Sequence, residues 1–465
     1  MKLYLYNSLK RNKQEFKPIK TGAVGLYTCG PTVYNFAHIG NLRTYIFEDI
    51  LKRVLIYNDY TVRHVMNITD VGHLTGDRDM GEDKMEKGAA REGKSAWDIA
   101  DFYARAFKKD IADLNILEPD IWVKATDTIP EQIDLVKALE KKGFTYRTAD
   151  GIYFDTSKFK AYTKLSHQNL EALQEGARVE RNPEKRNPTD FALWKFSPPN
   201  SSRQMEWESP WGVGFPGWHL ECSAMSMKFL GDQQDIHCGG TDHIDVHHTN
   251  EIAQSEAATG KPFFNFWMHG AFLIIQGGKK MAKSEGNFLT LENAFLNKNI
   301  NPLVYRFAAF LTHYRKPMEY SDEGIDAARN GLLHLQNQVR QLSAGDTQSA
   351  DEPSNTDFKN KFMEAINDDL NMPRAMAVIQ EMLKSNIRDT EKRTTILDFD
   401  RVLGLRLDQL DQEQALPAAV QKLVDARQKA RETKDFATSD QLRAEIEILG
   451  YQVQDAKDGM KVVKK

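Results

Sequence analysis

Blocks of apolar and polar positions near the amino end predict a strand, a helix and a second strand. The apolar run Ala23 to Cys29 is typical of a short buried strand, which Gly30 and Pro31 interrupt. Apolar residues then recur on one stripe of a helix from about Ile39 to Tyr57, and Tyr60 to Asn67 alternates like a second strand. Together these elements form a βαβ unit, which implies a parallel sheet with helices on its faces.

A second α/β region begins at Gly217 and again alternates helices with strands. Its expected elements are a helix, a strand, a helix and a strand, at His219–Phe229, Asp235–Cys238, about Asp242–Thr259 and Ala271–Ile275. Between the two regions, from about Leu117 to Asn200, helices alternate with short strands such as Gly151–Asp155, and charges and prolines are frequent. We interpret this segment as an insertion between two halves of one sheet.

Beyond Asn301 the pattern is almost wholly helical. Gln341–Asn355 is polar and typical of a linker. Amphipathic helices follow from Thr356 to about Leu403. A last module begins near Pro417 with two helices and ends in two strand-like runs around Asp458–Gly459, which is a hairpin signal.

These patterns predict an α/β fold, in which a Rossmann-like doubly wound parallel sheet carries an inserted α+β subdomain. A helical bundle and a small mixed C-terminal module follow the sheet. The expected boundaries are 1–116 with 201–300 for the sheet domain, 117–200 for the insertion, 301–403 for the bundle and 404–465 for the last module.

Composition adds few constraints to this picture. The chain is 41% hydrophobic and 28% charged, which is the balance of a globular protein. No window has about 18 consecutive apolar residues, and the amino end lacks the apolar stretch of a secretory signal. Three cysteines favour a reducing compartment, so we expect a cytoplasmic protein. A net charge of −4 gives no hint of nucleic acid, so any RNA binding must use a local basic surface.

Potential metal ligands are concentrated in one short region. Five of the twelve histidines lie between His219 and His248, together with Cys222 and Cys238, and Glu251 follows closely. Cysteine, histidine and glutamate are ordinary zinc ligands. There is no CxxC pair, and a single cysteine taken alone is more often a small buried hydrophobic residue than a metal ligand.

The predicted elements indicate how such ligands can meet. His247 and Glu251 are four residues apart on an expected helix and share a face. Cys29 ends a strand, and Cys222 lies in the helix that follows Gly217. Both can reach one rim, because ligands of open α/β sheets bind at the carboxyl ends of the strands. The spacing leaves open which histidine binds.

Two glycine-containing segments are suited to phosphate groups. In CGPTVYNFAHIGNLR, Gly30 and Gly40 allow close approach of the backbone, and the amino end of the following helix favours an anion. His38 in this segment can donate to a phosphate oxygen. In GGKKMAKSEGN, Lys280 and Lys283 can neutralise a leaving pyrophosphate. Neither segment is a P-loop or a GxGxxG fingerprint, which weighs against common kinases and dehydrogenases.

The pairing of these two segments resembles class I aminoacyl-tRNA synthetases, whose signatures are HIGH and KMSKS. Here they stand as HIGN (38–41) and KMAKS (280–284). Longer stretches are similar to the cysteinyl-tRNA synthetases in particular. They are YTCGPTVYNFAHIGN (27–41), NITDV (67–71), EKRNPTDFALWK (184–195), PGWHLECSAM (216–225), HCGGTDHIDVHHTNEIAQS (237–255) and KDFATSDQLRAEIEILG (434–450).

The resemblance implies one zinc ion in the amino-acid pocket, held by Cys29, Cys222, His247 and Glu251. It leaves Cys238 as a structural residue. Zinc binds and deprotonates a thiol, whereas a shape-only pocket separates near-isosteres such as cysteine and serine by about 10- to 200-fold. A separate editing site is then unnecessary. The substrate thiolate is expected as a fifth ligand or in place of Glu251, because catalytic zinc keeps a position open.

The resemblance also implies the other site residues. Contacts to cysteine are expected from Gly30, Thr69, Trp218, His219 and His237. Contacts to ATP, which would arrive with Mg²⁺, are expected from His38, Gly40, Asn41, Gly240, Asp242 and Lys283. The catalytic groups would be His38, Lys280 and Lys283.

The expected reaction joins L-cysteine to ATP as cysteinyl-adenylate and then moves the cysteinyl group to the terminal adenosine of tRNA-Cys. The bundle and the last module would grip the tRNA, reading unstacked bases. The family implies a monomer without membrane contact.

The sequence departs from the family pattern at four places. Asn41 replaces the last histidine of HIGH, Ala282 replaces the first serine of KMSKS, and Phe215 stands where many relatives have arginine. The stretch from Gly72 to Asp83 is longer and more polar than usual. Two alternatives stay open, a mycothiol-pathway-type cysteine ligase and a catalytically silent RNA-binding paralogue. The tail after Asn301 weighs against the first, and the intact His38, Lys283 and expected zinc ligands weigh against the second.

Overall fold

The computed structural model describes most of the chain, namely residues 1–72, 83–168, 182–198, 203–275, 279–280, 288–343, 353–410, 418–433, 435–456 and 459–464. None of the described helices is long and apolar enough to cross a membrane. Much of the predicted linker, most of the stretch from Gly72 to Asp83 and most of the lysine-containing loop lie outside the described residues.

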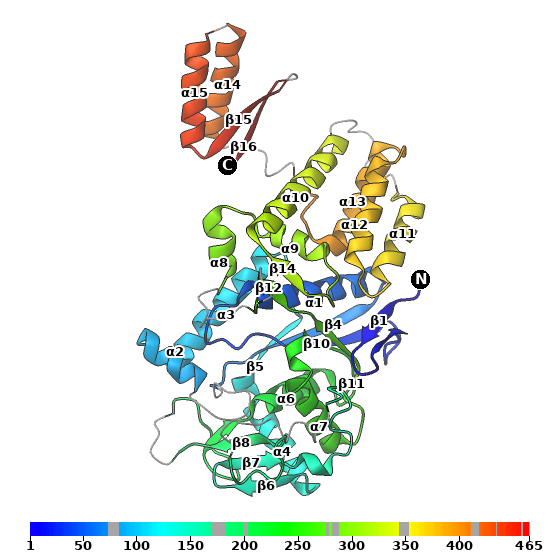
Figure 1. The fold of residues 1–465 in the computed structure, drawn as a ribbon, viewed down its shortest axis with the longest axis vertical. Coiled ribbons are helices and arrows are strands. Elements are labelled where there is room, and N and C mark those ends of the chain that lie inside the picture. Colours follow the sequence, from blue (N-terminus) through cyan, green and yellow to red (C-terminus); the bar gives the residue numbers. More distant parts are fainter. Residues whose placement is uncertain are drawn as a thin grey trace.

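A five-stranded parallel sheet forms the centre of the molecule (Figure 1). Its strand order is β11-β10-β3-β4-β5, with every neighbouring pair parallel. The strands are β3 (Ala23–Thr28), β4 (Thr61–Ile68), β5 (Ile121–Lys124), β10 (Gln234–Gly240) and β11 (Phe264–Gly270). The predicted Rossmann-like α/β class is therefore confirmed.

Helices cover both faces of this sheet. On one face, α1 (Ile39–Tyr57) packs its apolar stripe against side chains such as Leu26 and Ile236. On the other face, α6 (Trp218–Leu230) and α7 (His247–Thr259) pack on side chains such as Tyr27 and Trp267. Of these strands, β3 and β11 are largely apolar runs with little alternation, which is usual for strands buried on both faces.

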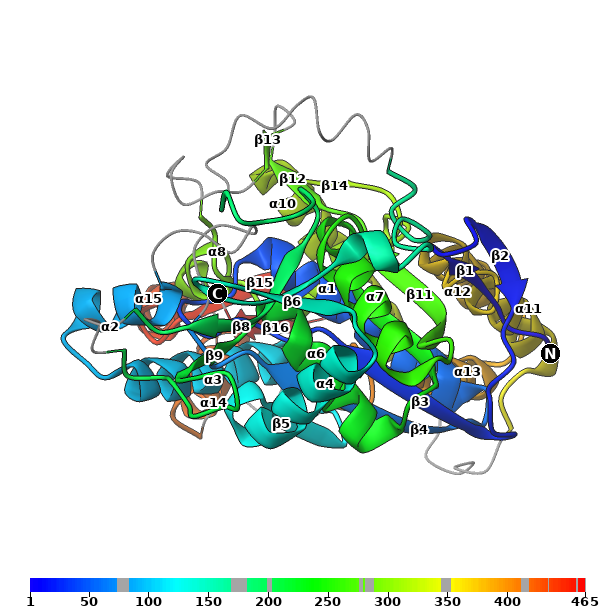
Figure 2. The same cartoon turned by 90° about the horizontal axis from the view of Figure 1, so that it is seen from below.

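The insertion between the two halves of the sheet forms its own layer. Four antiparallel strands in the order β6-β7-β8-β9 pack with α4, and they lie at the bottom of Figure 1. The elements are α4 (Ile129–Lys141), β6 (Thr145–Thr148), β7 (Gly151–Phe154), β8 (Phe191–Phe196) and β9 (Gly214–Pro216). Before it, α2 (Lys84–Glu92) and α3 (Ala96–Asp113) lie on the flank opposite the N-terminal hairpin of β1 (Tyr4–Asn7) and β2 (Asn12–Glu15) (Figures 1 and 2).

The carboxyl-terminal part is mainly helical, as predicted. The first helices are α8 (Leu291–Ala294), α9 (Leu303–Phe310) and α10 (Asp322–Ser343), and the bundle continues with α11 (Thr356–Ile366), α12 (Met372–Lys384) and α13 (Asp389–Leu403). The last module contains α14 (Ala418–Glu432) and α15 (Phe436–Ile448) with the antiparallel pair β15 (Tyr451–Ala456) and β16 (Gly459–Lys464). It lies at the top of Figure 1, beyond the bundle.

Three local expectations are wrong. The sheet strand after α7 is β11, and the expected strand at Ala271–Ile275 is instead β12 (Leu273–Ile275) in a separate sheet with β13 (Lys279–Lys280) and β14 (Met318–Tyr320). The strand β14 also interrupts the expected helical run. The helix expected from Asp242 begins at His247, because Thr241–His243 forms a 3₁₀ turn and Val246 leaves helical geometry at φ −128° and ψ −64°.

A buried arginine ties α1 to the helical bundle. Arg306 on α9 has no exposed side-chain surface and donates to Asp49 of α1 and to the carbonyl of Leu403 at the end of α13. Arg53 donates to the same carboxylate from one turn further along α1. Burial alone would raise the pKa of Asp49, but the charges of Arg306 and Arg53 hold it below its usual value. The helix that begins at the site is thus fixed at its middle.

Replacing Arg306 by methionine should leave Asp49 buried without this partner. We expect Arg306→Met to lower the free energy of unfolding by about 3–5 kcal/mol, measured by urea denaturation. The matched control is Arg374→Met, which removes an arginine from an exposed pair with Glu364 and should cost less than about 1 kcal/mol. Equal effects of the two substitutions would contradict the structural role given to Arg306.

Candidate functional site

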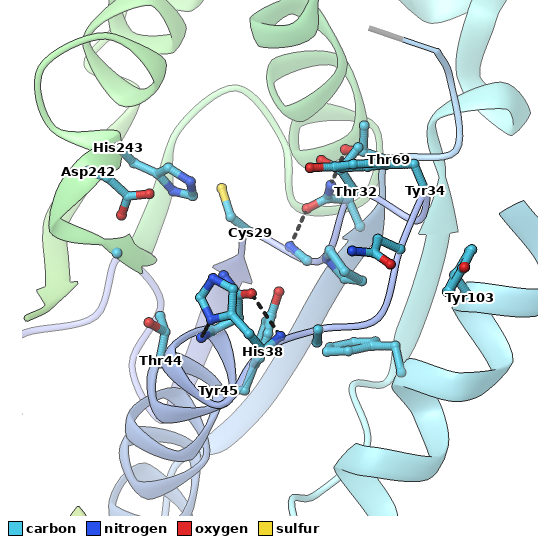
Figure 3. A pocket seen from close by; sticks show the side chains of 18 of the residues that line it. Cys29, Thr32, Tyr34, His38, Thr44, Tyr45, Thr69, Tyr103, Asp242 and His243 are labelled. Carbon is cyan, nitrogen blue, oxygen red and sulfur yellow. Dashed lines mark hydrogen bonds between the residues drawn. The ribbon is translucent and has the colours of Figure 1, made fainter. Parts of the chain in front are cut away.

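One cavity of about 460 Å³ lies at the carboxyl ends of β3, β4 and β10, beside the amino end of α1. Ligands of parallel α/β sheets bind at this edge. Figure 3 shows Cys29 between two walls, with Asp242 and His243 on one side and Tyr34 and Tyr103 on the other. The predicted site residues that line the cavity are Cys29, Gly30, His38, Asn41, Thr69, Trp218, Cys222, Gly240, Asp242 and His247.

Four side chains from separate elements meet beside this cavity. The sulfurs of Cys29 and Cys222, a ring nitrogen of His247 and a carboxylate oxygen of Glu251 all lie within 4.8 Å of one another. Cys29 follows β3, Cys222 is on α6, and the other two are one turn apart on α7. This set is the one that the family resemblance implies.

A second set overlaps with the first. Cys29, His237, His248 and Glu251 also offer ligand atoms within 4.8 Å of one another. Nε2 of His237 lies 3.0 Å from Oε2 of Glu251 and donates to it, whereas Oε1 of the same carboxylate lies 3.0 Å from Nε2 of His247. Geometry alone therefore leaves two arrangements for an ion, and they share one sulfur and one carboxylate.

Hydrogen bonds behind these side chains hold the rings in place. Nδ1 of His219 lies 2.9 Å from Nδ1 of His247, and this contact leaves Nε2 of His247 to face the ligand group. Nδ1 of His248 lies 2.8 Å from Nε2 of His269, whose Nδ1 lies 2.8 Å from Oγ of Ser8. Partners of this kind fix the ring orientation of metal-binding histidines.

The pKa values of the group are strongly perturbed. A hydrogen bond from Cys29 lowers the pKa of Cys222 to about 6, although burial opposes the change, whereas burial raises the pKa of Cys29 well above its usual value. Burial would lower the pKa of His247, but Cys222 and Glu251 raise it to about 10. Burial would raise the pKa of Glu251, but His237 and His247 lower it to about 2. At neutral pH and without an ion, the group thus combines a Cys222 thiolate and the Glu251 carboxylate with a protonated His247, whose proton would leave when a metal binds.

The donor set fits a zinc ion. Two sulfurs, one imidazole and one carboxylate are ordinary zinc ligands, and all four side chains are buried. Oε1 of Glu251 is buried and lies 3.0 Å from Nε2 of His247, but no described residue gives it a hydrogen bond of good geometry. This oxygen therefore keeps lone-pair capacity that a bound ion would use.

His38 caps the amino end of α1 with a defined tautomer. Its Nδ1 accepts a hydrogen bond from the amide of Asn41 at 3.1 Å, and the Asn41 side chain accepts from the amide of His38 at 3.2 Å. Burial lowers the pKa of His38 although Asp242 opposes the change, so its ring is neutral at pH 7 and carries its proton on Nε2. A Cβ at Gly40 would lie 2.9 Å from this ring. Close packing against His38 is therefore sufficient to require a glycine at this position.

The chain around Gly30 is held by an asparagine whose role the sequence analysis did not identify. Oδ1 of Asn67 accepts from the amide of Gly30 at 2.8 Å, and its Nδ2 donates to Oγ1 of Thr69 at 3.1 Å. A Cβ at Gly30 would lie 1.7 Å from the Asn67 carbonyl oxygen. The close approach at Gly30 is therefore to β4, not to a ligand alone.

The remaining predicted residues have different places. His219, His237 and Glu251 lie behind the cavity wall, in contact with lining residues or with one another. Lys280 belongs to the short strand β13, but its side chain, like the whole of Lys283, lies outside the described residues.

Several lining residues had no role in the sequence analysis, and three of them are aromatic or ionisable residues that border the ligand group or the entrance. Phe36, Tyr103 and His243 all border the cavity. His243 was only counted among the five clustered histidines. Aromatic residues such as Tyr103 on α3 have the spacing of core positions, so no local signal distinguishes them.

Comparisons with known proteins agree with this geometry. A model of the tRNA synthetases class I (C) catalytic domain matches residues 15–330. A DALR domain model matches residues 361–407, and a model of the cysteinyl-tRNA ligase anticodon binding domain matches residues 413–462. The last match favours a tRNA ligase over the alternative of a cysteine ligase without a full RNA-binding tail.

Solved structures of lower identity share the fold. The methionyl-tRNA synthetase of Mycobacterium tuberculosis with methionyl-adenylate aligns with a TM-score of 0.58 at 16% identity, over 90% of this chain and 96% of that chain.

Curated relatives are much more similar in sequence. Cysteine–tRNA ligase 1 of Burkholderia lata is 49% identical, with 99% of this chain and 97% of the relative covered. The cysteine–tRNA ligase of Treponema denticola is 43% identical over 98% of each chain. That of Thermococcus gammatolerans is 40% identical over 99% of this chain and 98% of the relative. The chain belongs to the cysteine–tRNA ligases, which are class I aminoacyl-tRNA synthetases.

Proposed function

We propose that this enzyme activates L-cysteine with ATP to cysteinyl-adenylate and then transfers the cysteinyl group to the 3′-terminal adenosine of tRNA-Cys. One observation carries the proposal: a single cavity is lined by the cysteines and histidine of a buried ligand group and by the capped amino end of α1. The first feature suits a thiol and the second suits a phosphate. Amino acid and nucleotide can therefore meet in one place.

The amino-acid end of the cavity would hold a zinc ion on Cys29, Cys222, His247 and Glu251. When bound, zinc supplies a soft Lewis acid that takes the substrate sulfur as a thiolate. The contact between the Nδ1 atoms of His219 and His247 would leave Nε2 of His247 available to the ion. Among the remaining roles, Gly30, Thr69 and Trp218 would contact the amino and carboxyl groups of cysteine, and His237 would brace Glu251.

The nucleotide end would act by positioning and by charge. A carboxylate oxygen of cysteine attacks the α-phosphorus of ATP, and pyrophosphate leaves. His38 presents its Nε2 proton to the phosphate while Asn41 holds its Nδ1, which is electrostatic stabilisation by a preorganised donor. Gly240 and Asp242 would hold the adenosine, and Gly40 leaves room for the His38 ring. Lys280 and Lys283, with Mg²⁺, would neutralise pyrophosphate.

The tRNA would contact the parts that follow the sheet. The anticodon-binding match at residues 413–462 supports contact of the last module with the anticodon. We assign 1–116 with 201–300 to catalysis, 117–200 to a connective insertion without editing, 301–403 to the tRNA stem and 404–465 to the anticodon. The two bounds of the insertion move to about 125 and 216, because β5 belongs to the central sheet and β9 to the sheet of the insertion. A monomeric, cytoplasmic enzyme remains a prediction.

Cysteine-dependent exchange of pyrophosphate into ATP tests the proposal. We expect kcat/KM for cysteine to exceed that for serine by more than about 200-fold, which is beyond the discrimination of a pocket by shape. Prolonged chelation should abolish the exchange, and added Zn²⁺ should restore it. Exchange without charging of tRNA-Cys would instead support the cysteine ligase, and absence of both would support the silent paralogue.

A cysteine substitution tests the ligand set. Cys222→Ser should weaken zinc binding by more than about 100-fold, because it removes a thiolate ligand. Loss of a residue that only supports a ligand typically weakens metal binding by about 10- to 100-fold. Zinc per chain, measured by elemental analysis after dialysis, should fall to a small fraction of the wild-type value. Cys238→Ala is the matched control, since this buried cysteine lies outside both ligand sets. Equal zinc in the two variants would rule out Cys222 as a ligand.

Asn41 tests the nucleotide end. Asn41→Ala should slow pyrophosphate exchange by about 10- to 100-fold, because His38 loses the reciprocal cap that orients it. Asn41→His should keep or modestly raise the rate, since an imidazole nitrogen can also accept from the His38 amide. A severe loss in Asn41→His would contradict this assignment.

A further inference from the structure

Three aromatic rings form a contiguous cluster at the mouth of the cavity. Phe36 lies in the segment between β3 and α1, and Phe102 and Tyr103 lie on α3. The ring centroids are 6.0 Å apart for Phe36 and Phe102, 5.0 Å for Phe36 and Tyr103, and 5.0 Å for Phe102 and Tyr103, all edge to face. Phe36 and Tyr103 both line the cavity, so the cluster is continuous with the site.

The cluster exposes apolar surface to solvent beside the cavity. Phe36 is 37% exposed and Phe102 is 38% exposed, whereas Tyr103 is buried beneath them. Single exposed hydrophobic residues are ordinary. Rings that touch one another, with a polar rim and beside a binding cavity, mark an interaction surface.

Hydrogen bonds and cationic side chains surround the rings. The hydroxyl of Tyr103 donates to Glu92 at 2.6 Å and accepts from Arg91 at 3.1 Å, which fixes the ring. Nζ of Lys94 lies 4.8 Å from the centroid of the Phe102 ring. Glu92 also lies 3.6 Å from Lys94 and partly offsets its charge. Proteins bind single-stranded nucleic acids with surfaces of this kind, on which bases stack on aromatic rings and phosphates lie near cationic side chains.

We propose that Phe36 and Phe102, supported by Tyr103, form a stacking site for an unpaired base of the tRNA 3′ end. The base is the one that precedes the terminal adenosine, because the terminal nucleotide must enter the cavity that Phe36 and Tyr103 border. This inference rests on the proposed transfer to tRNA. The site fits unpaired bases of any sequence, since every base has a face that can stack.

Binding of two forms of tRNA-Cys tests the stacking site. One form has its complete 3′ end, and the other lacks the unpaired terminal nucleotides. Affinities are measured by fluorescence anisotropy at one fixed salt concentration, since salt strongly changes RNA binding. The wild-type enzyme should prefer the intact form by about 5- to 150-fold, the range for stacking of one base.

Substitution of the rings should remove this preference selectively. Phe102→Ala and Phe36→Ala should each lower the preference for intact over trimmed tRNA nearly to the value expected when this base does not stack. Phe102→Trp should keep the wild-type preference. Affinity for trimmed tRNA should stay at the wild-type value in every variant, which reports an intact fold and intact contacts elsewhere. Trp97→Ala is the matched control, because Trp97 is 44% exposed on the same helix but contacts Trp207 instead of this cluster.

Two results would overturn the inference: full preference for intact tRNA in both alanine variants, or an equal loss in Trp97→Ala. Either result leaves the proposed function standing if the wild-type enzyme charges tRNA-Cys. Failure of the wild-type enzyme to charge tRNA-Cys with cysteine would instead remove the proposed function itself.

Discussion

The site depends on one fully buried carboxylate, Glu251, that is held between imidazoles. Its Oε2 accepts from His237 on β10, and its Oε1 faces His247 one turn earlier on α7, each at 3.0 Å. A charge taken out of water costs several kcal/mol unless partners of this kind compensate it. The same contacts fix the first turn of α7 against β10, and this turn faces the sulfurs of Cys29 and Cys222. The contacts that compensate the buried charge of Glu251 are therefore also the contacts that bring the ligand group together.

The two chemistries of the site share an edge because of the sheet topology. Parallel strands bring their carboxyl ends together, so β3, β4 and β10 deliver side chains to one cavity. The same crossover that makes β3 and β4 parallel places the amino end of α1 at this edge. A ligand group for sulfur and a helix end for phosphate thus follow from one arrangement, and the cap between His38 and Asn41 sets the tautomer.

A single helix connects the cavity with the helical bundle. With 19 residues, α1 spans about 28 Å. Its first turn borders the cavity, Asp49 at its middle pairs with Arg306, and Tyr57 at its end donates to Asp398 of the bundle at 2.6 Å. Because these anchors are buried or partly buried, the bundle cannot shift freely relative to the site. This geometry keeps the cavity and the helical bundle in a fixed relation to each other.

The sequence by itself determined the local elements: apolar periodicity predicted α1 within its observed bounds, and four-residue spacing placed His247 and Glu251 on one helical face. Only the tertiary structure decided which residues of different elements meet. It joined Cys29 to Cys222, added His237 to a second possible ligand set, and brought Phe36 against α3. It also assigned β11 to the sheet edge, since a fully buried apolar strand has no alternation to show its place. Periodicity reports the backbone of one segment, whereas neighbours in space depend on strand order and crossovers, which no local pattern contains.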